Sequence, residues 1–165
     1  HKSDVGGVVL GLPDPDGLQR AYLTMAGALG PEVSVDAMAA PGVEISVGVV
    51  RDDNFGPLVI VAAGGTLVEL LADRAVACPP LTRATATEML RSLRAAPLLA
   101  GWRGSTAVDI DALADVVVGF SRLATELGEH LDAVEANPVI AAPDGAVAVD
   151  ALVIPRRSPG DQNIA

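Results

Sequence analysis

The stretch from residue 135 to residue 150 constrains the fold of this chain more strongly than any other part of the sequence. At its centre, residues 143–145 read Pro-Asp-Gly, which is typical of a tight turn that ends on a left-handed glycine. Strand-like apolar runs at 139–142 and 146–153 flank this turn. We therefore predict a β-hairpin. Folding about the turn places Asn137 and Asp150 roughly opposite each other, where side chains of paired strands lie about 5 Å apart.

A carboxylate beside an amide oxygen suits Mg²⁺, which usually binds one or two carboxylates and completes its coordination with phosphate oxygens and water. Alternation along the two strands predicts that Ile140, Val147 and Val149 face the core, and it leaves Asn137 and Asp150 on the opposite face. The hairpin therefore predicts a magnesium site. The alternative is an ordinary edge hairpin, in which Asn137 begins a turn and Asp150 is solvated.

The composition requires a core of aliphatic side chains. The chain has 165 residues, 50% hydrophobic and only 2% aromatic, so Ala, Val and Leu must fill a core that this length makes substantial. Expected strands and helices mix without a regular strand–helix–strand repeat, and hairpins are prominent. These features predict an α+β fold with a mixed, largely antiparallel sheet flanked by helices.

The net charge of −10 argues against partners that require a positive field. Nucleic acids and anionic membranes are therefore not expected, whereas a nucleotide can still bind locally through backbone amides and a metal ion. Cys78 is the only cysteine and there are two histidines, so neither a disulfide framework nor a Cys- or His-rich metal site is expected. No apolar run approaches the ~20 residues of a membrane span, and no signal-peptide pattern is present, so we expect a cytoplasmic protein.

Local signals predict the remaining elements. Helices are expected at 15–29, at 66–73, at 83–95 after the N-cap Thr82, and up to Leu127 after a cap at Asp109 or Asp111. Strands are expected at 8–12, 33–38, 43–50 and 58–63. Residues 155–165 form a polar tail that we expect to be disordered.

A glycine pair, Gly64 and Gly65, opens the helix expected at 66–73. Glycines let the backbone approach a ligand closely, and the free amides at a helix start favour an anion. Glu69 lies one turn into this helix. The alternatives are an ordinary strand-to-helix turn for the glycines and a solvated helix face for Glu69.

Several segments follow one another in an order that is more specific than any one of them. They are His1-Lys-Ser-Asp-Val-Gly-Gly-Val, Gly42-Val-Glu-Ile-Ser-Val-Gly-Val-Val-Arg-Asp with Phe55-Gly-Pro, Gly64-Gly with Leu67-Val-Glu-Leu-Leu, Pro80-Leu-Thr, Pro97-Leu-Leu-Ala-Gly-Trp-Arg-Gly, Asn137-Pro and Val149-Asp-Ala. The set resembles the ATP-grasp portion of NDP-forming acyl-CoA synthetases of the ADP-forming acetyl-CoA synthetase type, which are related to succinyl-CoA synthetase β-subunits. The resemblance extends from His1 to Ile154.

The resemblance implies an enzyme that converts a carboxylic acid, CoA and ATP into acyl-CoA, ADP and phosphate through an acyl phosphate and a phosphohistidine. Mg²⁺ and ATP or ADP are the implied cofactors. By position, Asn137 and Asp150 match the metal-binding Asn and Asp of the family, and His1 matches a histidine implicated in phosphoryl relay.

The resemblance also implies a set of nucleotide-binding residues. Glu44 and Glu69 match acidic positions of the nucleotide cleft, and Gly64 and Gly65 match the glycine pair of the family. Arg51 is the basic residue expected near the phosphates.

The same resemblance implies how the chain is divided. Residues 1–37 correspond to a remnant of the smaller ATP-grasp lobe, 38–154 to the larger lobe, and 155–165 to the tail. In the family, a strand with an ATP-binding lysine precedes the His-Lys-Ser-Asp motif, and a separate domain or subunit binds CoA. We therefore expect the chain to be inactive alone, to need that CoA-binding partner, and to form homo-oligomers through exposed apolar surface.

Four apolar residues stand where the family commonly has polar ones: Ala37, Ala77, Ala133 and Leu152. They favour an alternative function, a non-catalytic regulatory module like those fused to acetyltransferase domains. A third reading is a generic acidic α+β oligomerisation domain, for which the resemblance would be accidental.

Overall fold

The computed structural model describes residues 2, 5–64 and 72–156, and the chain divides into two compact units, His1–Ala39 and Ala40–Ala165. This division lies close to the predicted lobe boundary after residue 37, and the assignment of the units to ATP-grasp lobes stays a prediction. The helix predicted at 66–73 and most of the tail predicted at 155–165 lie outside the described residues.

The first unit contains the predicted helix, α1 (Pro15–Leu29). The side chain of Asp14 caps it by accepting a hydrogen bond from Gly17 N at 2.6 Å, and Pro15 occupies the first helical position. Gly30, whose φ is 110°, ends the helix. These signals are local, and the sequence predicts them correctly.

The strands predicted at 8–12 and 33–38 of the first unit are wrong. Neither segment pairs in the sheet, and Leu10 and Val35 within them are 71% and 66% exposed. An apolar segment forms a strand only where a neighbour satisfies its backbone hydrogen bonds, and no described residue does so here.

The second unit is built on a six-stranded antiparallel sheet. Its strands are β1 (Val43–Asp52), β2 (Gly56–Ala63), β3 (Arg74–Ala77), β4 (Leu131–Ala142), β5 (Gly145–Ala148) and β6 (Ala151–Pro155). The order is β3-β2-β1-β4, and both β5 and β6 pair with the other edge of β4. This confirms the predicted α+β fold and both predicted hairpins, β1–β2 and β4–β5. The run predicted as one strand at 146–153 is divided into β5 and β6, and β3 and the first half of β4 were not predicted.

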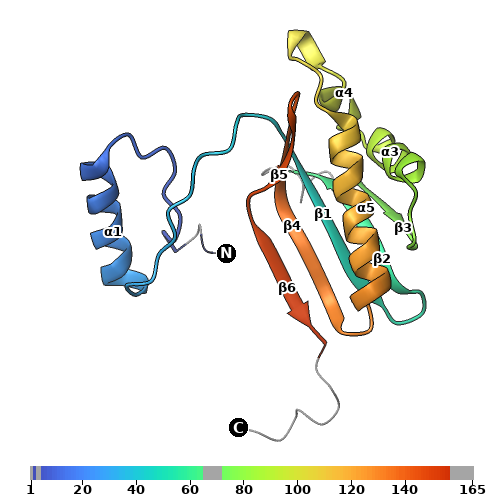
Figure 1. The fold of residues 1–165 in the computed structure, drawn as a ribbon, viewed down its shortest axis with the longest axis horizontal. Helices are drawn as coiled ribbons and strands as arrows, with labels where there is room; N and C mark the ends of the chain where they lie inside the picture. Colours follow the sequence, from blue (N-terminus) through green and yellow to red (C-terminus); the bar gives the residue numbers. More distant parts are fainter. Residues whose placement is uncertain (1, 3–4, 65–71, 157–165) are drawn as a thin grey trace, which may run out of the picture. The chain divides into compact units, whose positions relative to one another are not determined.

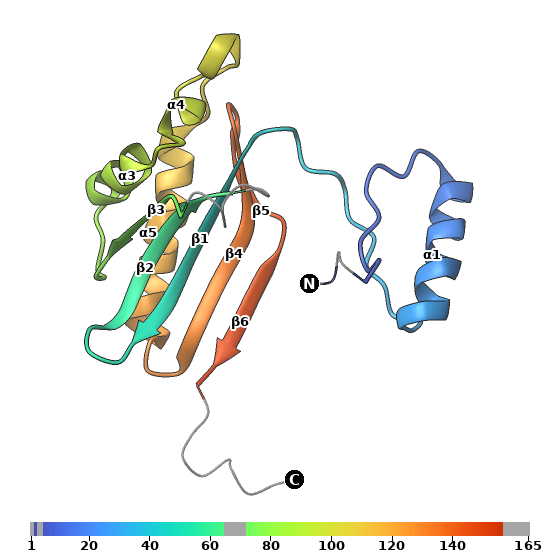
Figure 2. The ribbon, with the colours of Figure 1, turned by 180° about the vertical axis from the view of Figure 1, so that it is seen from behind.

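Helices cover one face of this sheet (Figure 1), and the view from behind shows the strands in front of them (Figure 2). They are α3 (Arg83–Ser92), α4 (Ala96–Leu99), the short 3-10 turn η1 (Trp102–Gly104) and α5 (Ile110–Leu127). Two predicted caps are confirmed: Thr82 accepts from Thr85 N at 3.1 Å, and Asp109 accepts from Ala112 N at 2.9 Å. The opposite face of the sheet has no covering helix among the described residues of this unit.

The core lies between the sheet and these helices, and it is aliphatic, as the composition predicts. Ile45 and Val47 of β1 and Val59 of β2 have no exposed surface, and they belong to one cluster with Leu90 of α3 and Leu113 of α5. Because side chains alternate along a strand, the residues between these buried positions lie on the uncovered face. In the described part of the chain, no helix is long and apolar enough to cross a bilayer.

Replacing Leu113 with Ala should destabilise the second unit by about 2–5 kcal/mol, because Leu113 is fully buried and its truncation leaves a cavity. Leu127→Ala on the same helix is the matched control, since Leu127 is 43% exposed and should cost less than about 1 kcal/mol. Urea unfolding with an unchanged slope measures both free energies. Equal losses would contradict this packing.

Candidate functional site

The structure brings Asn137 and Asp150 together at the junction between β5 and β6. Asn137 N donates a hydrogen bond to Asp150 O at 3.1 Å, and Val149 N donates to Pro138 O at 3.1 Å. Asn137 is exposed and Asp150 is half-buried, and one carboxylate oxygen of Asp150, Oδ1, accepts from Ala151 N at 3.0 Å. The two residues therefore lie opposite each other across the hairpin, as the turn predicts.

A bulge in β4 decides which side chains lie on the uncovered face here. Ile45 of β1 pairs with Val139 of β4, and Val47 pairs with Ala136. Two residues of β4, Asn137 and Pro138, therefore lie opposite the single residue Ser46 of β1, which is a β-bulge. Proline has no N–H to donate to the ladder, so it is tolerated at such an irregular position. The Asn137–Pro138 peptide bond is cis.

The bulge overturns the predicted core face of the hairpin. Ile140 is half-buried, and Val147 and Val149 are 49% and 46% exposed, so these side chains do not form the core. Val139 and Ala141 are fully buried in their place. An extra residue shifts the alternation of β4 by one position, and every later side chain changes face.

Glu135 joins this group, although it was not predicted from the sequence. It precedes Asn137 by two positions, and this spacing places both residues on one face of a strand. The spacing could have identified Glu135 as a site residue from the sequence. Ser46 Oγ donates to Glu135 Oε1 at 2.7 Å across the β1–β4 pairing. Ser46 is 9% exposed and Glu135 is half-buried, so the contact fixes this carboxylate on the uncovered face.

Glu44 and Gly64 meet at the same end of the sheet. Gly64 N donates to Glu44 O at 2.7 Å, and a Cβ added to Gly64 would lie 2.4 Å from Glu44 C, closer than atoms can approach. Only glycine fits this approach. Glu44 is exposed and precedes Ser46 by two positions, so it shares the uncovered face with Ser46 and Glu135.

Arg51 does not join this group. It lies five positions beyond Ser46 on β1, about 17 Å along the strand. Its guanidinium donates to Gly128 O at 2.8 Å and pairs with Glu129 at 3.3 Å, so it ties the end of β1 to the end of α5. The structure thus places Arg51 on the helix-covered side, away from Asn137 and Asp150. Three further predicted site residues lie outside the described residues: His1, Gly65 and Glu69.

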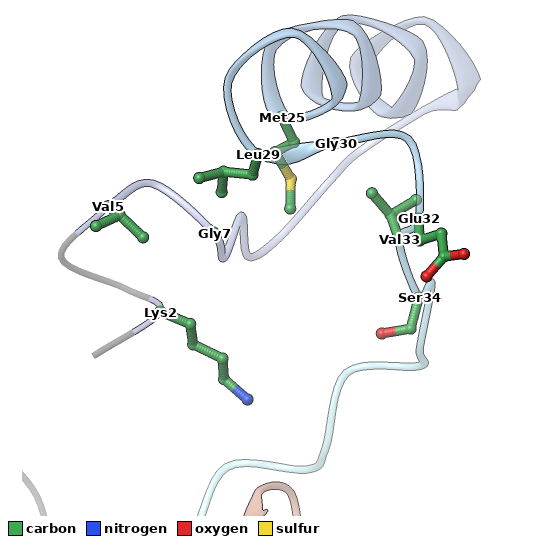
Figure 3. A pocket seen from close by; sticks show the side chains of 9 residues that line it. All are labelled: Lys2, Val5, Gly7, Met25, Leu29, Gly30, Glu32, Val33 and Ser34. Carbon is green, nitrogen blue, oxygen red and sulfur yellow. The ribbon is translucent and has the colours of Figure 1, made fainter. Parts of the chain in front are cut away.

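A separate cavity of about 300 Å³ lies within the first unit (Figure 3). Its lining combines polar side chains from Lys2, Glu32 and Ser34 with the apolar side chains of Met25 and Leu29. Figure 3 shows these residues coming from the start of the chain, the end of α1 and the segment after it. Its volume lies at the lower end of the range for small-molecule pockets, about 300–1,000 Å³, so it suits a small group.

The oxygen atoms around Asn137 suit a hard cation. Asn137 offers an amide oxygen and Asp150 and Glu135 offer carboxylates, while Mg²⁺ keeps positions for water and phosphate. Within residues 2, 5–64 and 72–156, no three or more His, Cys, Asp or Glu side chains are placed to hold a metal ion. A cation here would therefore depend on the amide oxygen and on oxygens of a bound ligand, as Mg²⁺ commonly does with nucleotide phosphates.

Comparison with known proteins identifies the fold. The family model for the ATP-grasp domain matches residues 1–154. The chain is 40% identical over 162 residues to the beta subunit of acetate–CoA ligase (ADP-forming) I from Pyrococcus furiosus, with 93% of this chain and 69% of that subunit covered. It is 38% identical over 158 residues to acetate–CoA ligase (ADP-forming) I from Archaeoglobus fulgidus, with 91% of this chain and 23% of that protein covered.

Solved structures agree. An acetyl-coenzyme A synthetase 1 from Candidatus Korarchaeum cryptofilum, in complex with coenzyme A and Mg-AMPPCP, superposes with a TM-score of 0.85 at 38% identity, covering 94% of this chain and 71% of that one. A protein from Pyrococcus horikoshii superposes with a TM-score of 0.84 at 29% identity, covering 96% and 71%. The family resemblance predicted from the ordered motifs is therefore confirmed.

Replacing Gly64 with Ala should destabilise the second unit by about 1–3 kcal/mol, because the added methyl group would overlap the backbone of Glu44. Gly119→Ala is the matched control: no atom lies within 4 Å of its added Cβ, and Ala in a helix should stabilise by about 0.5–1 kcal/mol. Chemical denaturation of both variants measures these changes. A neutral Gly64→Ala would show that Gly64 does not approach the backbone of Glu44 so closely.

Proposed function

Because this chain belongs to the ATP-grasp domain family and is homologous to the beta subunits of ADP-forming acetate–CoA ligases, we propose that its uncovered sheet face binds Mg²⁺ and nucleotide phosphates. The observation that carries the proposal is the pairing of Asn137 with Asp150 on β4 and at the β5–β6 junction. The backbones of the two residues are hydrogen-bonded, so the chain offers one side-chain amide and one carboxylate at this point of the hairpin, and Mg²⁺ takes such ligands when phosphates supply the rest.

The residues of this face have different tasks in the proposal. Asn137 and Asp150 hold the metal, and Glu135, fixed by Ser46, adds a carboxylate next to them. Glu44 and the amide of Gly64 lie at the start of the face, where the nucleotide cleft of the family has an acidic residue and a glycine pair. Mg²⁺ bound there supplies positive charge that offsets the negative charge of a transferring phosphoryl group.

The remaining predicted residues enter the proposal through the family resemblance. His1 is proposed for phosphoryl relay, and Gly65 and Glu69 for nucleotide binding. Arg51 was expected near the phosphates, but its contacts with Gly128 and Glu129 do not support that role.

We propose that the whole protein converts a carboxylic acid, CoA and ATP into acyl-CoA, ADP and phosphate through an acyl phosphate and a phosphohistidine. Its relatives of this class are ADP-forming acid–CoA ligases, and a structural relative contains coenzyme A and Mg-AMPPCP. A CoA-binding domain or subunit is the proposed partner, the isolated chain is proposed to be inactive, and the reaction would take place in the cytoplasm.

A second candidate function is a non-catalytic module that retains the nucleotide site. Leu152 favours it: this side chain is 57% exposed and pairs with Glu135 in the β4–β6 register, where the family commonly has an arginine. Ala37, Ala77 and Ala133 are further positions at which polar groups of the family are missing. Under this alternative, the whole protein would bind Mg-ADP without forming acyl-CoA.

Asn137→Ala and Asp150→Asn should each weaken binding of Mg-ADP by about 10- to 100-fold, because each removes an oxygen ligand or its charge. Isothermal titration calorimetry of the whole protein measures this affinity with and without Mg²⁺. Asp144→Asn, an equal loss of charge at the exposed hairpin turn, should leave the affinity unchanged. An unchanged affinity of Asp150→Asn for Mg-ADP, or ADP binding that does not need Mg²⁺, would contradict the proposal.

A further inference from the structure

We propose that Arg74 is a phosphate-binding residue of this site, at the opposite end of a row of paired strand residues from the metal ligands. The proposal rests on the proposed function, since it assigns a second contact for the same nucleotide. It was not predicted from the sequence, and none of the sequence motifs contains this residue.

The register of four strands places Arg74 in line with the metal site. Arg74 of β3 pairs with Ala62 of β2, Ala62 pairs with Ser46 of β1, and Ser46 lies opposite the bulge at Asn137 and Pro138 in β4. Paired residues in an antiparallel sheet share a face. Arg74 therefore stands in the same row, and on the same face, as the bulge that presents Asn137.

The residues between the two ends of this row are small. Ala62 and Ser46 have short side chains, and the carboxylate of Glu135 lies beside Ser46, where it accepts a hydrogen bond from Ser46 Oγ. Three strand spacings of about 4.8 Å separate β3 from β4, about 14 Å in all. An arginine side chain and a chain of two or three phosphates together bridge that distance, so one end of the polyphosphate can contact the metal ligands and the other can contact Arg74.

The charge of this face favours a further cation in addition to the metal ion. The uncovered face carries the carboxylates of Glu44, Glu135 and Asp150, and the whole chain has a net charge of −10, so phosphates are repelled unless a local positive charge offsets them. Within the described strands, the basic residues are Arg51 and Arg74. Arg51 is engaged on the helix-covered side with Gly128 and Glu129.

The state of the Arg74 side chain fits this role. It is exposed, and among the described residues its guanidinium has no hydrogen-bond or ion-pair partner, so binding an anion breaks no contact seen in the structure. Guanidinium groups match phosphate oxygens with two parallel hydrogen bonds, which makes arginine a strong phosphate ligand. The neighbouring Ala75 and Ala77 face the core instead and pack against it.

The test compares nucleotides that differ only in their phosphates, using the whole protein and calorimetry. Arg74→Gln should weaken binding of Mg-ADP and of a non-hydrolysable Mg-ATP analogue by about 10- to 100-fold, the effect of losing a hydrogen bond between charged groups. Binding of adenosine, which has no phosphate, should not change. Arg74→Lys keeps the charge without the planar fork and should retain part of the affinity.

Arg91→Gln is the matched control, because Arg91 is an exposed arginine in the last turn of α3, on the helix-covered side. An affinity of Arg74→Gln for Mg-ADP within twofold of the unmodified protein would overturn the proposal. An equal loss in Arg91→Gln would also overturn it, since the effect would then follow net charge alone. Asp150→Asn separates the two proposals: a loss there without one in Arg74→Gln refutes only the role of Arg74.

Discussion

The pairing of β1 with β4 is the interaction on which the candidate site depends. β4 binds β1 along one edge and β5 and β6 along the other, so any change in its register moves all of these strands. The bulge at Asn137 and Pro138 interrupts this pairing once. Without the extra residue, strict alternation from Ala136 would bury Ile140 and turn Val139 towards the uncovered face. The bulge therefore buries Val139 in the core and also places Asn137 beside the candidate site.

Structure that depends on local chemistry could be predicted from the sequence. The caps at Asp14, Thr82 and Asp109 and the turn at 143–145 involve residues within a few positions of each other, and each signal is confirmed. The family resemblance was predictable because its motifs occur in order. The strands at 8–12 and 33–38 failed because strand formation requires a partner, which an apolar pattern does not reveal.

In the candidate site too, contacts between residues close in sequence could be predicted, and contacts between distant residues could not. The turn brings Asn137 and Asp150 together, so their proximity could be predicted from spacing. The contact between Ser46 and Glu135 joins residues 89 positions apart, and the row that contains Arg74 depends on three strand pairings at once. Arg51 looked suitable by position, but the end of α5, 77 positions away, engages its guanidinium. The positions of Glu135, Arg74 and Arg51 depend on contacts between segments far apart in the sequence, which the sequence pattern does not reveal.

An acidic chain that binds phosphates needs short-range attraction, because its long-range field is unfavourable. A divalent cation at Asn137 and Asp150 would convert carboxylates that repel phosphate into ligands that recruit it, so metal and nucleotide should bind together rather than in sequence. At 0.1 M salt, exposed charges more than about 10 Å apart are largely screened from each other. Direct contacts between a metal ion and phosphate oxygens are shorter than this, so salt weakens them less than it weakens long-range attraction of the nucleotide. The net charge of −10 and a nucleotide site on this face are therefore compatible.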